Sequence, residues 1–343
     1  MVPALAVADE LRAEGAEVVF VGGDRAETKL VPGAGYELRR LRVVALPRGR
    51  RFGAAARAAA IDIRAAGRAL SLIGALRPAA VLGAGGYVAG PIALAAVLRR
   101  VPLVLAEADS HLGLTNRLLA PFAERVCLAF PIEGRAGRRY LVTGRPVPAA
   151  AEDRPAARRR FGIAEHETCV LVFGGSQGAR SINEAALQAF KGARFRVLHA
   201  AGEDNLGALR SPGPHYDLRG YIEEFGAALA ACDLVIARAG GSVFEIAAHG
   251  RPAILIPYPH ATADHQRTNA GYLERAGAAV VIDDAELTGV RLAQETGNLL
   301  ADPARLAAMA RASAALARVD AAATIARELL LAARRRDDSP KQG

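Results

Sequence analysis

A short apolar run that leads straight into a glycine-rich turn and then into a helix restricts this chain to α/β folds. Residues 169–173, Cys-Val-Leu-Val-Phe, have the continuous apolar character of a strand buried in a parallel sheet. Glycines follow at 174, 175 and 178. They let an anion approach the main chain, and the positive end of the next helix faces it. The turn predicts a phosphate site, with the steric need for glycine in a tight turn as the alternative.

The same alternation of strand, turn and helix recurs along the chain, which is typical of parallel sheets covered on both faces. The 343 residues suffice for two domains with full cores. Residues 145–160 have linker composition. We therefore expect α/β domains at 1–148 and 149–343, with a ligand cleft at the carboxyl ends of their strands. The predicted strands are 18–21, 43–46, 80–82, 103–106, 169–173, 195–199, 233–237, 253–257 and 278–282, and the predicted helices of the first domain include 3–14, 54–75 and one after Pro91.

The composition argues against several classes of function. No run of eighteen apolar residues appears, and the first residues lack the regions of a signal peptide, so we expect a cytosolic protein. Cys127, Cys169 and Cys232 lie singly in apolar runs, which predicts reduced core thiols and no metal site. The formal charge of +9 comes almost wholly from arginine, and the 5% aromatic residues do not interleave with basic runs. We therefore expect no nucleic-acid partner.

An arginine-rich stretch at residues 39–68 leads into a predicted helix. Arg57, Arg64 and Arg68 share one face of this helix. Such a surface favours peripheral contact with anionic lipid headgroups, and a solvated helix face accounts for it equally well.

Two further polar turns follow later strands of the second half. Ser242 and Glu245 have the spacing of a helix capping box, and Glu245 is equally suited to accept hydrogen bonds from a ribose diol. His265 and Gln266 could bind a hydroxyl or pyrophosphate oxygen, with loop capping by Asp264 as the alternative. Because parallel strands end at one edge of their sheet, three such turns favour a nucleotide diphosphate over a simple phosphate.

The first half offers a different set of groups. Residues 83–91, Gly-Ala-Gly-Gly-Tyr-Val-Ala-Gly-Pro, form a flexible turn that we expect to line the opposite wall of the cleft. After the next strand, Glu107, Asp109 and His111 place two carboxylates and an imidazole at a strand's carboxyl end. Such groups suit general-base work on an alcohol, and helix capping by Asp109 or Ser110 is the alternative.

Five motifs, in this order, resemble the MurG family of bacterial glycosyltransferases. They are GAGGYVAGP at 83–91, GLTNR at 113–117, GGSQGAR at 174–180, ARAGGSVFE at 237–245 and DHQRTNA at 264–270. The resemblance covers nearly the whole chain. It implies the GT-B glycosyltransferase fold, in which two Rossmann-like parallel-sheet domains face a cleft. The first domain would hold the acceptor and the membrane, and the second the UDP-sugar donor.

The resemblance also implies an activity. It is the transfer of N-acetylglucosamine from UDP-N-acetylglucosamine to lipid I, the undecaprenyl-linked muramyl-pentapeptide acceptor, which gives lipid II in peptidoglycan synthesis. The implied reaction inverts the anomeric carbon and needs neither metal nor cofactor. The implied location is the cytoplasmic side of the cell membrane, as a peripheral protein.

Site residues follow from the resemblance, position by position. The implied donor contacts are Gly175, Ser176 and Gln177 on the pyrophosphate side, Ile222 at the base, Gly241, Ser242, Val243, Phe244 and Glu245 at the ribose-binding turn, and His265 and Gln266 at the sugar hydroxyls. Asp109 stands where the family commonly has an asparagine that contacts the donor sugar. Glu107 or Asp109 is the available base for the acceptor hydroxyl.

The chain also departs from the family. It starts at the helix that follows the family's opening strand and Gly-Gly-x-Gly-Gly-His loop, so the histidine of that loop is absent. We expect a mis-assigned translation start at Met1, because losing a central strand would cost more core than a domain's marginal stability can absorb. Pro148 stands where the family has an arginine, unless Arg145 replaces it.

Two alternatives remain open at this point. One is a glycosyltransferase of the same fold that acts on another lipid acceptor, such as diacylglycerol. The other is a non-catalytic protein that binds a nucleotide sugar or acts as a membrane scaffold.

Overall fold

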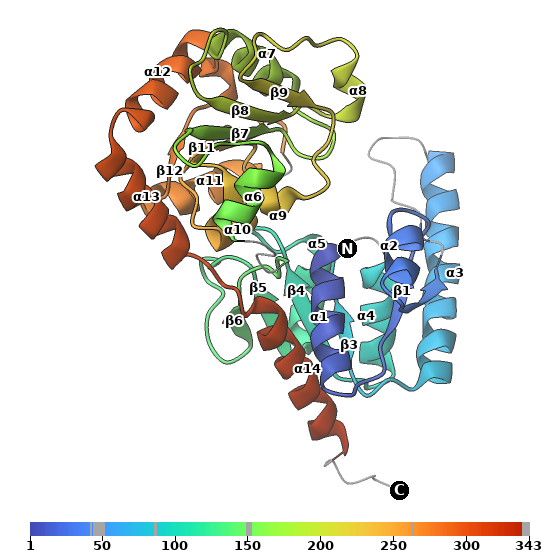
Figure 1. The fold of residues 1–343 in the computed structure, drawn as a ribbon. Helices are drawn as coiled ribbons and strands as arrows, with labels where there is room; N and C mark the ends of the chain where they lie inside the picture. The colour runs from blue at the N-terminus through green and yellow to red at the C-terminus, as the bar shows by residue number, and fades with distance from the viewer. Residues whose placement is uncertain (42, 44–51, 86–87, 149–152, 262–263, 338–343) are drawn as a thin grey trace, which may run out of the picture. The chain divides into compact units, whose positions relative to one another are not determined.

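The chain forms two compact units, which we describe separately. The computed structural model describes residues 1–41, 43, 52–85, 88–148, 153–261 and 264–337, and in the helix at 52–76 it describes side chains from Arg64 onward. Unit 1 comprises Met1–Val147 and Asp320–Gly343, and unit 2 comprises Pro148–Val319 (Figure 1). None of the helices formed by the described residues is both long and apolar enough to cross a membrane.

Unit 1 is an α/β unit with parallel strands. Its elements are α1 (Val2–Ala13), β1 (Val19–Gly22), α2 (Glu27–Gly33), β2 (Glu37–Arg40), α3 (Phe52–Leu76), β3 (Val81–Gly83), α4 (Ala89–Leu98), β4 (Leu103–Glu107), α5 (Leu114–Leu119), η1 (Ala120–Phe122), β5 (Arg125–Leu128), β6 (Tyr140–Val142) and α14 (Ala321–Asp337). Strands β3, β4, β5 and β6 form one sheet in that order, and β1 pairs with β2 in a second sheet. Among the described strands, none joins the two sheets.

Unit 2 contains a single parallel sheet. Its elements are α6 (Arg154–Arg160), β7 (Cys169–Phe173), α7 (Arg180–Ala189), β8 (Arg196–Ala200), α8 (Glu203–Leu206), β9 (Tyr216–Arg219), α9 (Phe225–Ala231), β10 (Leu234–Ala237), α10 (Val243–Ala248), β11 (Ala253–Leu255), α11 (His265–Arg275), β12 (Ala279–Val281), η3 (Asp284–Glu286), α12 (Gly289–Leu300) and α13 (Pro303–Ala315). The strand order is β12-β11-β10-β7-β8-β9. Helices α7 and α12 cover one face and α6 and α9 the other (Figure 1).

Strand β7 lies at the point where the order of the unit 2 sheet reverses. The chain builds outward from β7 to β8 and β9, then returns to β10 on the other side of β7. All five residues of β7 are buried, as expected for a central strand covered on both faces. In open α/β sheets, ligands bind outside the carboxyl ends of the strands at such a switch point. The turns after β7 and β10 flank it.

Eight of the nine predicted strands are confirmed. Strands β2 and β9 were not expected, and residues 154–160, predicted as linker, form helix α6, whose buried Arg158 donates to the main chain at Ala231 and Ala164. The predicted strand 43–46 lies almost wholly outside the described residues. The three cysteines are buried and free, as predicted, and burial raises the pKa of Cys127 and Cys232 to about 12.

The last helix differs from the predicted domain range. The sequence places it in the second domain, but α14 packs on α1 and β4 of unit 1. Its apolar face shares a core cluster with Val7, Val104 and Cys127. Arg125 Nε also donates to Glu328 Oε2 at 2.7 Å, an ion pair largely shielded from solvent. The chain therefore returns to unit 1 after completing unit 2.

A buried histidine lies in the core of unit 2. His199, on β8, is 0% exposed. Its ring nitrogens lie 2.7 Å from Tyr216 Oη and 3.1 Å from Asn183 Oδ1, two uncharged partners. Burial lowers the pKa of His199 to about 4, from an ordinary value of 6.5. The imidazole is therefore neutral in the folded protein at neutral pH.

We expect this histidine to make stability depend on pH. In the unfolded chain His199 binds a proton near pH 6.5, whereas in the folded chain it stays neutral down to about pH 4. The unfolded state binds more protons in this window, so stability is full above it and falls as the pH drops through it, by about 3 kcal/mol in total. Urea unfolding followed by circular dichroism at several pH values measures the slope.

The comparison variant is His199→Gln, in which the part of the pH dependence of the unfolding free energy that comes from His199 should be absent. His166→Gln, at an exposed position of the same unit, should keep it. Equal slopes in His199→Gln and the wild type would contradict the prediction.

Candidate functional site

The turn after β7 places bare main chain at the switch point of unit 2. Gly175 and Gly178 have φ values of +97° and +73°, which residues other than glycine rarely adopt. Gly175, Ser176 and Gln177 are exposed. Helix α7 follows, and Ala179 at its N-cap provides no side-chain cap. The first N–H groups of α7 and its positive dipole end are therefore available to an anion.

The turn after β10 has a different character from the one predicted. Ser242 makes no capping hydrogen bond at the start of α10, so the capping-box interpretation is not supported. Val243 and Phe244 are 0% and 7% exposed, and both belong to the core. Of these two implied ribose-side contacts, therefore, the main chain and not the side chain could reach a ligand. Gly241, Ser242 and Glu245 are each partly exposed.

Arg238 lies at the candidate site, and the sequence assigned it no role. It follows β10 directly and is 8% exposed. Its Nη1 donates to Asp284 Oδ1 at 2.6 Å and to the carbonyls of Ile256 and Pro257. Its Nη2 donates to Ser181 Oγ at 2.8 Å. Arg238 thus ties the ends of β10 and β11 to the first turn of α7.

Helix α11 brings its polar residues to the β10 turn. Gln266 Oε1 accepts from Tyr258 N at 3.0 Å, and the Gln266 amide lies beside Gly240. Asn269 is buried and donates to Ala239 O at 3.1 Å. Asp264 does not cap α11 with its side chain, so the alternative of loop capping is not supported. The structure therefore places Gln266 next to the β10 turn, and His265 precedes it on α11.

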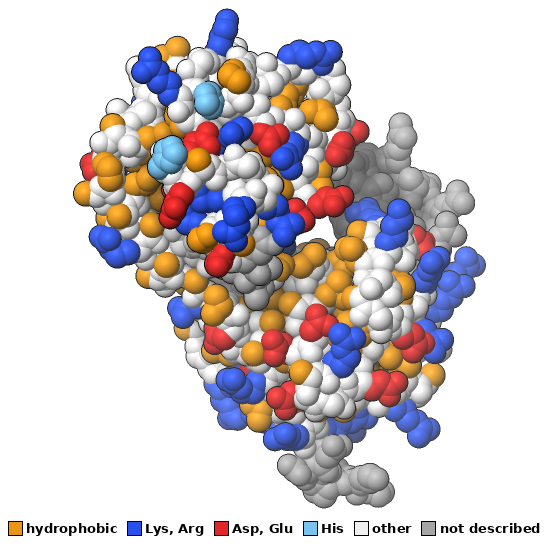
Figure 2. Space-filling view, viewed as in Figure 1, with side chains coloured by type: hydrophobic (Ala, Val, Ile, Leu, Met, Phe, Trp, Pro, Cys, Tyr) orange, Lys and Arg blue, Asp and Glu red, His pale blue; other side chains and the backbone are white. Residues whose placement is uncertain are grey.

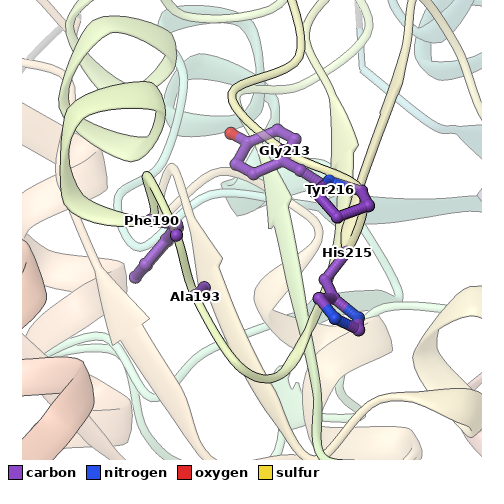
Figure 3. A pocket seen from close by; sticks show the side chains of 7 residues that line it. Phe190, Ala193, Gly213, His215 and Tyr216 are labelled. Carbon is purple, nitrogen blue, oxygen red and sulfur yellow. The ribbon is translucent and has the colours of Figure 1, made fainter.

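Ile222 lies after β9, at the same carboxyl-end edge. Its side chain is 3% exposed, so contact with a nucleotide base would involve its main chain. It borders a depression of about 300 Å³, lined also by Glu203, Arg219, Tyr221, Glu223 and Glu224. A second pocket, before β9, has about 20 Å³, room for one water (Figure 3). The depression after β9 is therefore the better candidate for a base.

The two carboxylates of unit 1 have different environments. Glu107 is the last residue of β4 and is 8% exposed. It accepts from Gly113 N at 2.8 Å, Asn116 Nδ2 at 2.9 Å and Asp109 N at 3.2 Å. Helix α5 begins at Leu114, so Asp109 and Ser110 do not stand at its N-cap. Glu107 therefore holds the loop at 108–113, and the side chain of Asp109 is partly exposed.

Known proteins resemble this chain over nearly its full length. Residues 1–128 match the glycosyltransferase family 28 N-terminal domain, and residues 169–325 match the family 28 C-terminal domain. The protein of Alkalilimnicola ehrlichii named UDP-N-acetylglucosamine--N-acetylmuramyl-(pentapeptide) pyrophosphoryl-undecaprenol N-acetylglucosamine transferase is 43% identical, over 97% of this chain and 95% of that protein. The protein of the same name from Nitrosococcus oceani is 42% identical, over 96% and 94%.

Solved structures agree with this relationship. The crystal structure of MurG from Acinetobacter baumannii matches with a TM-score of 0.76 and 28% identity, covering 96% of this chain and 95% of that one. The calicheamicin glycosyltransferase CalG4 matches with a TM-score of 0.70 at 18% identity, which supports the fold alone. The expected GT-B glycosyltransferase fold is confirmed. On this sequence and structural similarity, the chain belongs to glycosyltransferase family 28 and, within it, to the MurG family.

Proposed function

We propose that this enzyme transfers N-acetylglucosamine from UDP-N-acetylglucosamine to lipid I, the undecaprenyl-linked muramyl-pentapeptide, and so forms lipid II. The observation that carries the proposal is the pair of turns at the switch point of unit 2, in a chain that is 42% identical to a transferase named for this reaction. Uncapped N–H groups of α7 suit a diphosphate leaving group.

The donor side is assigned from the residues around that switch point. The turn at 175–177 holds the diphosphate through main-chain N–H groups and the Ser176 hydroxyl. Glu245 accepts hydrogen bonds from the ribose diol, and the main chain at Ile222 holds the base. His265 and Gln266 contact hydroxyls of the sugar. When the bond between the anomeric carbon and the phosphate oxygen breaks, the dipole of α7 stabilises the charge that develops on UDP.

The acceptor side is assigned to unit 1. The muramyl hydroxyl attacks the anomeric carbon from the face opposite the leaving UDP, and its proton passes to a carboxylate. We assign that carboxylate to Asp109, because Glu107 already accepts three hydrogen bonds from its own loop. Glu107 then acts as a positioning residue that fixes the loop carrying Asp109.

A transfer assay tests the activity directly. We expect radiolabel from UDP-N-acetylglucosamine to appear in a lipid I analogue, and Glu245→Gln to raise the KM for the donor about tenfold through a weaker ribose contact. With 2′,3′-dideoxy-UDP as a competitor, the same substitution should change little. Binding of UDP-sugar without any transfer would favour a non-catalytic protein, and transfer to diacylglycerol in its place would identify another lipid acceptor.

The choice of base has its own test. Asp109→Asn should lower kcat about a hundredfold or more, because general-base catalysis contributes at least that much. Glu107→Gln should also lower kcat, and it should lower the melting temperature, since an amide cannot accept all three hydrogen bonds. Glu133→Gln, exposed in the same unit, is the control for both measurements. An unchanged kcat in Asp109→Asn would rule out its role as the base.

We further propose that unit 1 contacts the cytoplasmic side of the cell membrane peripherally. Charge alone does not identify which surface of unit 1 would contact the membrane, because basic, acidic and apolar side chains are mixed on the face seen in Figure 2. Arg64 and Arg68 of the predicted basic surface are exposed, but Arg42, Arg48, Arg50, Arg51 and the side chain of Arg57 lie outside the described residues.

The more specific feature of unit 1 is an apolar surface. Helix α4 contacts α5, and α5 contacts the short helix η1. Together they carry five apolar side chains that are 42–64% exposed: Leu94, Leu98, Leu114, Leu118 and Phe122.

This surface has the spacing of a membrane-contacting face. Leu114, Leu118 and Phe122 recur every four residues, and Arg99, Arg100 and Arg117 are exposed beside the apolar side chains. Leucine and phenylalanine can enter the boundary of the acyl chains while arginine meets anionic headgroups.

Vesicle sedimentation checks the membrane proposal. The wild type should bind phosphatidylglycerol vesicles more tightly than phosphatidylcholine vesicles. The double variant Leu118→Ser, Phe122→Ser should bind at least about tenfold more weakly, because each side chain loses its apolar burial. Val290→Ser, which removes a 70% exposed side chain from α12, serves as the control and should bind normally. Undiminished binding by the double variant would place the membrane surface elsewhere.

A further inference from the structure

The turn after β7 is in direct main-chain contact with the segment after β8. A Cβ atom at Gly178 would lie 1.8 Å from Ala201 O, and a Cβ at Gly202 would lie 2.4 Å from Gln177 O. Both glycines have positive φ values, +73° and +93°. The position of the turn is therefore fixed by what holds residues 201 and 202.

Two asparagine side chains converge on this contact. Asn183 Nδ2 and Asn205 Nδ2 each donate to Ala201 O at 2.9 Å. Asn205 Nδ2 also donates to Gln177 O at 3.0 Å. An amide nitrogen has two N–H donors, so Asn205 can serve both carbonyls at once. Asn205 thus bridges the turn and the segment on which it packs.

The chain of hydrogen bonds continues into the core. A carbonyl oxygen only accepts, so Asn183 must direct Nδ2 at Ala201 and Oδ1 at His199 Nε2. His199 Nε2 then carries the proton, and Nδ1 accepts from the hydroxyl of Tyr216. Tyr216, His199 and Asn183 are 6%, 0% and 2% exposed. Donation therefore runs in one direction, from Tyr216 on the edge strand β9 to Ala201 O, and the last bond of this chain holds the Ala201 carbonyl.

The bond from Asn205 to Gln177 O selects one orientation of the peptide between Gln177 and Gly178. Glycine tolerates both signs of φ, so a peptide beside it can flip at low cost. A flipped peptide would lose this bond and the one that Gly178 N donates to Gly175 O at 2.9 Å, and it would turn a carbonyl dipole to where an N–H dipole now points, which weakens the attraction for an anion.

We propose that Asn205 is a positioning residue for the donor diphosphate. It holds the Gln177 carbonyl against the Ala201–Gly202 segment, so that the N–H groups of the turn keep their direction. Tyr216, His199 and Asn183 support it by fixing the Ala201 carbonyl. The inference rests on the proposed function, which places the diphosphate at this turn.

Calorimetric titration with UDP and with uridine tests the role, because only UDP carries the diphosphate. Asn205→Ala should raise the Kd for UDP about tenfold, because the turn loses the hydrogen bond to Gln177 O that orders it, and should change the Kd for uridine less than twofold. Asn205 is partly exposed, so the variant is expected to fold, and its melting temperature is measured alongside. Asn298→Ala, at an exposed position on α12, is the matched control and should bind both ligands normally.

Two results would overturn the inference in distinguishable ways. An Asn205→Ala variant with the wild-type ratio of UDP to uridine affinity would exclude the positioning role and leave the proposed function standing. A wild type that binds UDP no more tightly than uridine would remove the diphosphate site itself, and the positioning role with it.

Discussion

The proposed donor side of this enzyme depends on the position of β7 in its sheet. Because β7 lies between β8 and β10, the turns after β7 and β10 open at one edge, on either side of the switch point. The strand can occupy that place because its five residues are apolar and buried on both faces. Everything assigned to the donor follows from this arrangement. The helix that begins after β7 directs its N–H groups to the edge, and α11 reaches the same edge through Gln266 and Asn269.

Buried polar groups beneath that edge hold the loops in place by hydrogen bonds. Arg238 donates to Asp284, to Ser181 and to two carbonyls, and so joins three loops whose main chains could otherwise move independently. Its charge is partly offset by Asp284, which limits the cost of burying a cation. On the opposite side of β7, uncharged groups do the corresponding work, from Tyr216 through His199 to the Ala201 carbonyl. The exposed turn is thus held by interactions made below the surface.

The sequence predicted well what apolar patterning controls. Buried strands such as β7 and β10 were found, whereas β2 and β9 were missed, because Glu37-Leu-Arg-Arg40 and Tyr216-Asp-Leu-Arg219 lack the apolar character of central strands and lie at sheet edges. The motifs predicted the turns after β7 and β10 but not the burial of Val243 and Phe244. Arg238 and Asn205 were missed for another reason. Their partners are 46 and 28 residues away in sequence at Asp284 and Gln177, and nothing in local spacing indicates such pairs.

On the proposed acceptor side, two neighbouring carboxylates take different roles. Glu107 and Asp109 are two residues apart, and sequence alone could not choose between them as base. Strand geometry buries the first, which ends β4, and its carboxylate then has to accept the N–H groups of the loop that follows. One of those donors is the N–H of Asp109 itself. The position of Asp109 therefore depends on Glu107, so loss of activity on changing Glu107 would not identify it as the base.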